Sequence, residues 1–161
     1  MTEERRRLIQ EGFVAGLLGY GAVVVLFGIL NLAAGESPFH TASLLGSALL
    51  GSSLDQAGAL GPVLAYNGLH LVVSVLLGTA AAFLASRAEL DHDLGSGVIF
   101  GLLALGGWIP IFFGAITVEY LHALSWVEVV AGSVVGAGAI LAYIGRTHWS
   151  LVQALFEEAQ V

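Results

Sequence analysis

The stretch GFVAGLLGYGAVVVLFGILNLAA, from Gly12 to Ala34, decides the fold class of this chain. It contains no charged residue, and a bilayer core about 30 Å thick needs roughly 20 apolar helical residues to cross it. The stretch is therefore predicted to be a membrane-spanning helix. Because its apolar part is longer than the roughly 7–15 residues of a signal-peptide core, we interpret it as a retained span.

Three further stretches of the 161-residue chain are also long and apolar, with no charge near the middle. The four predicted spans cover about residues 12–34, 62–86, 96–118 and 125–146. Charged residues make up 11% of the chain, whereas soluble domains carry about 25%. Backbone amides find no water in the hydrocarbon layer, so each span is expected to be helical. We predict a single all-α domain over residues 1–161, an integral membrane four-helix bundle.

The five basic residues orient the predicted bundle. They are Arg5, Arg6 and Arg7 before the first span, Arg87 after the second and Arg146 at the end of the fourth. If the chain crosses four times, all of them lie on one side of the membrane. The positive-inside rule then predicts a multi-pass protein of the cell inner (plasma) membrane with both termini in the cytoplasm.

Two shorter helices are predicted outside the spans. Residues 38–51 are apolar but too short to cross, and they follow Ser37-Pro38, a typical helix start. We expect this segment to be an interfacial or re-entrant helix on the outer face. At the other end, apolar residues recur at helical spacing from Trp149 to Phe156. This pattern predicts an amphipathic surface helix over about residues 148–159.

Small residues recur at every fourth position of the spans. Examples are Gly12 and Gly16 in the first span, Ser74 and Gly78 in the second, and Gly132 with Gly136 in the fourth. Lipid gives helices little hydrophobic reason to associate, so close approach over small residues supplies the attraction. The glycine-rich faces are expected to pack the helices together or to dock a partner.

A polar cluster opens the second span, where Tyr66, Asn67 and His70 share one helix face. Polar groups at membrane depth are costly unless paired, and they suggest function by default. One interpretation is hydrogen bonding between helices. The other is a cofactor site, either for haem, with His122 or His40 as the second axial ligand, or for a quinone.

A weaker pattern suggests a metal site near the outer ends of the third and fourth spans. Glu119 and His122 form a Glu-x-x-His step, and Glu128 begins the next span. Di-iron bundles use two such steps and two further carboxylates. The competing interpretation is a short outer loop with acidic residues near helix ends.

The absence of certain sequence features argues against nucleic-acid binding and against catalysis. A net charge of −7 with five basic residues is unlike a nucleic-acid-binding surface. The sequence carries no phosphate-binding glycine loop, paired-histidine zinc step or Gly-x-Ser-x-Gly elbow, so no enzyme is expected. We predict a non-catalytic accessory subunit of a larger inner-membrane complex, such as a respiratory one, whose partners are the lipid bilayer and other membrane subunits. The alternatives are the cofactor-binding protein described above and a small oligomeric transporter or channel.

Overall fold

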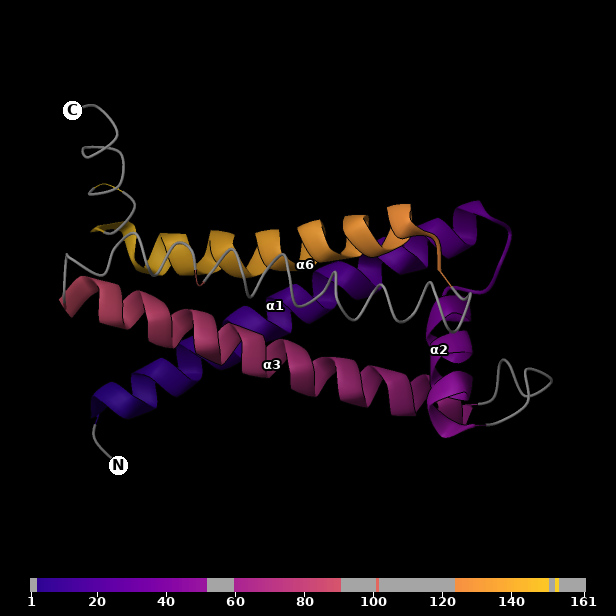
Figure 1. The fold of residues 1–161 in the computed structure, drawn as a ribbon, viewed down its shortest axis with the longest axis horizontal. Coiled ribbons are helices and arrows are strands. Elements are labelled where there is room, and N and C mark those ends of the chain that lie inside the picture. The colour runs from indigo at the N-terminus through magenta and orange to yellow at the C-terminus, as the bar shows by residue number, and fades with distance from the viewer. Residues whose placement is uncertain (1–2, 52–59, 91–100, 102–123, 151–152, 154–161) are drawn as a thin grey trace.

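A computed structural model describes residues 3–51, 60–90, 101, 124–150 and 153 of the chain. These residues form four helices and no strand (Figure 1). The helices are α1 (Glu3–Ala33), α2 (His40–Leu50), α3 (Leu60–Leu90) and α6 (Trp126–Thr147). α1, α3 and α6 are long and apolar enough to cross a membrane, which confirms three of the predicted spans as helices of that kind. The predicted span at 96–118 lies outside the described residues, except for Gly101.

α1 begins nine residues before the predicted span, at Glu3 instead of Gly12. The added residues are mainly Glu and Arg, which are good helix formers in water. Arg7 Nε also donates to Glu11 Oε1 at 2.9 Å, a pairing one turn apart that supports the helix. The helix therefore continues from the apolar stretch into its charged flank.

α2 begins two residues later than predicted, at His40. The residues before it form a turn in which the His40 N–H donates to the Ser37 carbonyl at 2.9 Å. The helix ends as expected at Gly51, whose φ of 62° is the left-handed conformation that glycine adopts readily. Figure 1 shows α2 lying across the start of α3, where Gly46 packs against the backbone of Pro62.

α6 starts with a capping box formed by Ser125 and Glu128. The Ser125 hydroxyl accepts from the Glu128 N–H at 3.3 Å, and Glu128 Oε2 accepts from the Ser125 N–H at 2.7 Å. These bonds satisfy two donors at the helix start and explain why the helix begins where the sequence predicts. Most of the helix predicted at 148–159 lies outside the described residues.

Close contacts between glycines and backbone hold α1 against α3. A Cβ atom added to Gly16 would overlap the backbone of Ser74 and Val75, and one added to Gly78 would overlap the backbone of α1 at Gly12 and Gly16. The packing predicted from the spacing of small residues is confirmed at this crossing. α6 packs mainly on α1, and there Gly136 faces Val23.

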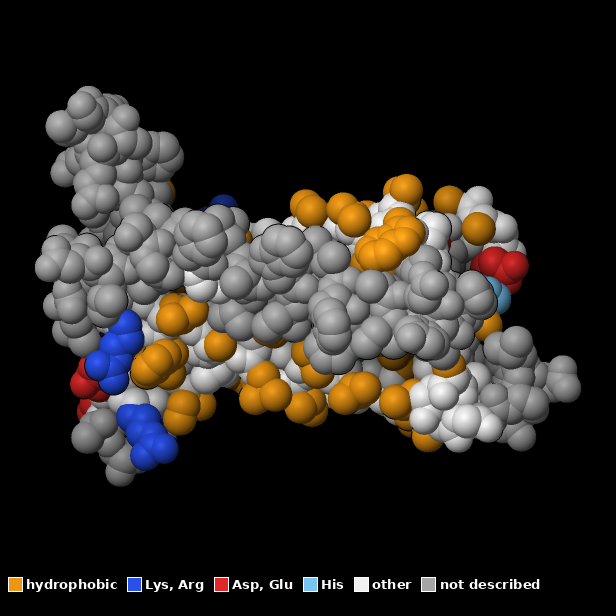
Figure 2. Space-filling model, viewed as in Figure 1, with side chains coloured by type: hydrophobic (Ala, Val, Ile, Leu, Met, Phe, Trp, Pro, Cys, Tyr) orange, Lys and Arg blue, Asp and Glu red, His pale blue; other side chains and the backbone are white. Residues whose placement is uncertain are grey.

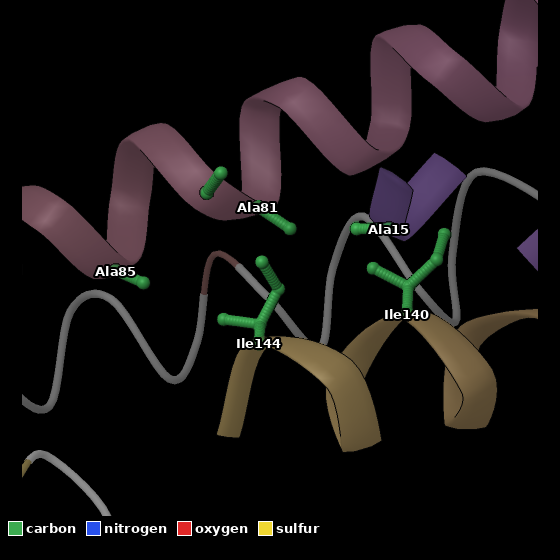
Figure 3. Close-up of a cluster of buried hydrophobic side chains, with 6 residues drawn as sticks. Ala15, Ala81, Ala85, Ile140 and Ile144 are labelled. Atoms are coloured by element: carbon green, nitrogen blue, oxygen red, sulfur yellow. The ribbon is translucent and has the colours of Figure 1, made fainter. Parts of the chain in front are cut away.

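The buried core consists mainly of alanines with two isoleucines, while many large apolar side chains are exposed. The core cluster consists of Ala15, Ala81, Ala82, Ala85, Ile140 and Ile144 (Figure 3). Exposed large apolar residues are spread along all three long helices, and Figure 2 shows many on one face. Soluble proteins rarely expose apolar surface on this scale. The distribution suits a surface that faces lipid.

The arginines gather at one end of the molecule. Figure 1 shows the start of α1 at the same end as the last turns of α3 and α6. These segments carry Arg5–Arg7, Arg87 and Arg146. The opposite end holds α2 and the start of α6. We call the arginine-bearing end the basic end.

Candidate functional site

The predicted polar cluster on α3 gains a fourth member from α1. Tyr20 donates its hydroxyl hydrogen to Asn67 Oδ1 at 2.9 Å, which links the two helices. The Tyr20 ring meets His70 edge-on, with 5.4 Å between ring centroids, and Tyr66 lies 5.6 Å from His70 on the same measure. Tyr66, Asn67 and His70 therefore lie together as predicted, and they face a partner helix.

Both polar atoms of the Asn67 side-chain amide form hydrogen bonds. Its Oδ1 atom accepts from Tyr20, while its Nδ2 atom donates to the Val63 carbonyl one turn earlier, at 2.8 Å. For His70, the described part of the chain offers ring contacts and no hydrogen bond. Among the described residues the Tyr66 hydroxyl likewise has ring contacts only, so the imidazole and this hydroxyl are the members of the cluster with hydrogen-bonding capacity left for a ligand.

A second set of hydrogen bonds closes the neighbouring corner between α1 and α2. Asn31, near the end of α1, donates from Nδ2 to the Pro38 carbonyl at 3.1 Å. Its Oδ1 atom accepts from the Thr41 hydroxyl at 2.8 Å. Asn31 and Thr41 are both buried. We call Asn31, Pro38 and Thr41 the Asn31 lock, because their hydrogen bonds fix the start of α2 to α1.

A small pocket lies between the cluster and the lock. Its lining residues come from α1, from α2 and the turn before it, and from α3; they are Val23, Val24, Phe27, Asn31, Pro38, Phe39, Thr41, Ala42, Tyr66, Asn67 and His70. The volume is about 30 Å³, which is room for one or two water molecules. Sites for drug-sized ligands are typically about 300–1,000 Å³. The pocket that these residues bound does not fit a porphyrin or a quinone ring.

The other predicted ligands are not brought to this pocket. His40 lies outside its lining and pairs with Glu36 on the adjoining turn, at 3.5 Å between Nδ1 and Oε2. His122 and Glu119 lie outside the described residues. Glu128 is engaged in the capping box of α6. Within the described ranges, no group of three or more His, Asp or Glu side chains is arranged to hold a metal ion.

Two parts of the site were missed by the sequence analysis. Tyr20 was not singled out, although it lies one turn after Gly16 on the face that meets α3. Asn31 and Thr41 were also not paired, because their contact depends on the angle at which α2 leaves the turn. A polar residue at the end of an otherwise apolar span was the available signal for Asn31.

Comparison of the chain with protein families, with curated proteins and with solved structures finds no match.

Removing the Tyr20 hydroxyl should weaken the contact between α1 and α3. We expect Tyr20→Phe to lower the free energy of unfolding by about 0.6–2 kcal/mol, the usual worth of a hydrogen bond between membrane helices. The measurement is SDS-driven unfolding in mixed micelles. Tyr143→Phe is the matched control, because the Tyr143 ring packs against the core and its hydroxyl has no hydrogen bond to a described residue. Equal losses in the two variants would show that the Tyr20 bond contributes nothing.

Proposed function

We propose that the chain is an integral membrane four-helix bundle that serves as a non-catalytic structural subunit beside other membrane proteins. Its termini would lie in the cytoplasm and α2 would lie at the outer surface. The gathering of the arginines at the basic end supports this orientation. α3 ends at that end and α6 begins at the opposite one, which supports a further crossing between them, at the span predicted for 96–118.

The observation that carries the proposal is a second set of glycines that face outward. Within the described part of the chain, an added Cβ atom has no neighbour within 4 Å at Gly21 and Gly28 on α1, Gly61 and Gly68 on α3, and Gly138 on α6. On the inner faces of the same helices, glycines make the closest helix contacts. Open glycines on a membrane helix expose backbone to which another helix can pack closely.

The polar cluster supports a structural role more than a cofactor role. Its principal hydrogen bond joins α1 to α3, and its pocket has about 30 Å³ of space. Three further hydroxyl side chains on the spans form hydrogen bonds within their own helices. The hydroxyls of Thr79, Ser86 and Ser133 each donate to a carbonyl one turn earlier in their own helix. These groups are satisfied within the chain and need no ligand.

Site-specific photocrosslinking in the native membrane tests the proposal. A photoreactive residue is placed at Val25, which lies between Gly21 and Gly28 and is exposed. The control position is Val23, which faces Gly136 inside the chain. We expect Val25 to capture a different membrane protein in a defined ratio and Val23 to capture none.

Substitution of the open glycines adds a second readout. Gly28→Leu should reduce capture at Val25 at least about tenfold, which corresponds to roughly 1.4 kcal/mol of docking energy. The chain itself should remain folded, because none of the residues that the structure describes lies within 4 Å of the added Cβ atom. Crosslinks to copies of the same chain alone would contradict the subunit role. A visible haem band that His70→Ala removes would instead favour the cofactor-binding alternative.

A further inference from the structure

Three helices meet at the basic end around one buried histidine. His148 caps the end of α6, and its side chain is 6% exposed. Its Nε2 atom lies 3.3 Å from Glu11 Oε2 on α1, and its Nδ1 atom lies 3.0 Å from Glu89 Oε1 on α3. All three residues lie just beyond the predicted spans. We call them the His148 junction.

Further polar groups surround the junction. On α1, Arg7 pairs with the other oxygen of Glu11 at 2.9 Å. After α6, the Ser150 hydroxyl donates to Glu89 Oε1 at 2.9 Å. Among the described residues, the titratable and charged groups in the network are thus Arg7 and Glu11 from α1, Glu89 from α3, and His148 itself.

The position of the ring between two carboxylates determines which protonation state suits the junction. A neutral imidazole has one N–H donor and one lone pair, so one of its nitrogens would face a carboxylate oxygen without a proton between them. An imidazolium carries a positive charge that lies within 3.3 Å of both carboxylates. Neither contact has good hydrogen-bond geometry, so the attraction rests mainly on charge.

Charge balance leads to the same conclusion. With the imidazole protonated, Arg7 and His148 offset Glu11 and Glu89. With the proton lost, the junction keeps an extra negative charge, and the two carboxylates, of which Glu11 is mostly buried and Glu89 is partly exposed, no longer have a positive charge between them. The two carboxylates lie against opposite nitrogens of the ring, so one bound metal ion could not take the place of the proton for both.

We infer that the His148 junction is a proton-controlled lock, in which a proton on the buried imidazole holds the end of α6 to α1 and α3. A ligand stabilises the state that binds it better, and here the ligand is the proton and the state is the closed junction. The closed form is therefore favoured at lower pH, and raising the pH until the imidazole loses its proton releases it.

Distance measurements between α1 and α6 test the lock. The sequence contains no cysteine, so introduced cysteines can be labelled specifically. Spin labels are attached at Ile9→Cys and Ala142→Cys, both at exposed positions near the junction. In nanodiscs we expect one short distance at pH about 5.5 and a growing longer-distance population toward pH about 8.5. A distance distribution that stays constant over this range would overturn the proposal.

Variants separate His148 from the other groups. His148→Gln should lose the pH response, because glutamine binds no proton in this range. His40→Gln, at the opposite end, should keep it. If His148→Gln fails to fold, Glu89→Gln replaces it, with the expectation of a response reduced at least twofold. An unchanged pH response in either junction variant would overturn the proposal that a proton on His148 controls the junction.

Discussion

Gly16→Ile is expected to separate α1 from α3 and to remove most of the stability of the folded chain. The added Cβ atom would overlap the backbone of Ser74 and Val75, and a backbone atom cannot rotate away as a side chain can. Overpacking a core ordinarily costs about 1–3 kcal/mol and sometimes more. Because the helices must also give up the contact between Gly12 and Gly78, we expect a loss of at least about 3 kcal/mol. SDS-driven unfolding in mixed micelles measures this loss.

Gly21→Ile is the matched control for that experiment. Gly21 lies on the same helix, and no described residue lies within 4 Å of an added Cβ atom there. The same side chain should therefore change the free energy of unfolding by about 0.5 kcal/mol or less, as for other surface substitutions. If both variants unfolded at the same SDS concentration, the crossing of α1 over α3 would not be the contact that stabilises the fold.

The glycine spacing predicted this contact only in part. The sequence identified small residues at every fourth position of the spans, and at Gly16 and Gly78 these residues do form the crossing. It did not show which helices pair, because the same spacing recurs on several of them. Pairing depends on how side chains such as Val23 and Ile140 fill the grooves beside Gly136 and Gly19, which periodicity alone does not encode.

The polar cluster was also predicted only in part: the sequence predicts which residues share a helix face, but not which residue of another helix meets them. The common face of Tyr66, Asn67 and His70 follows from helical spacing, and the structure places the three side chains together. Tyr20 joins them because α1 and α3 run antiparallel from the contact between Gly16 and Val75. One turn further along α1 from Gly16, the long Tyr20 side chain reaches the preceding two turns of α3, where its ring meets His70 and its hydroxyl reaches Asn67. That register becomes visible only once the helix pair is known.

The His148 junction is the least predictable feature. His148 was interpreted as the beginning of a surface helix, since apolar residues follow it at helical spacing. Its carboxylate partners belong to two other helices far away in the sequence. The sequence did contain one signal: Glu11, Glu89 and His148 each lie at the end of a span on the same predicted side of the membrane. This placement puts the three residues at the same depth relative to the bilayer.

Asn31→Leu is expected to release α2 from α1 while the long helices stay packed. The substitution leaves the buried Thr41 hydroxyl without its acceptor and the Pro38 carbonyl without its donor. A buried polar group that loses its partner costs about 1–3 kcal/mol. Since each one or two kcal/mol changes an equilibrium by a factor of about 5–30, the open form of α2 should become at least about fivefold more populated.

Cysteine labelling measures that release. The reporter is Ser43→Cys, at a position that is 3% exposed in α2, and a second reporter, Ala82→Cys, lies in the core of α3. In the Asn31→Leu background we expect maleimide to label position 43 at least about fivefold faster, while position 82 stays protected. Thr41→Val should have a smaller effect, because Asn31 keeps its bond to Pro38. Equal labelling of position 43 with and without Asn31 would mean that packing of Gly46 on Pro62, and not the Asn31 lock, holds α2 in place.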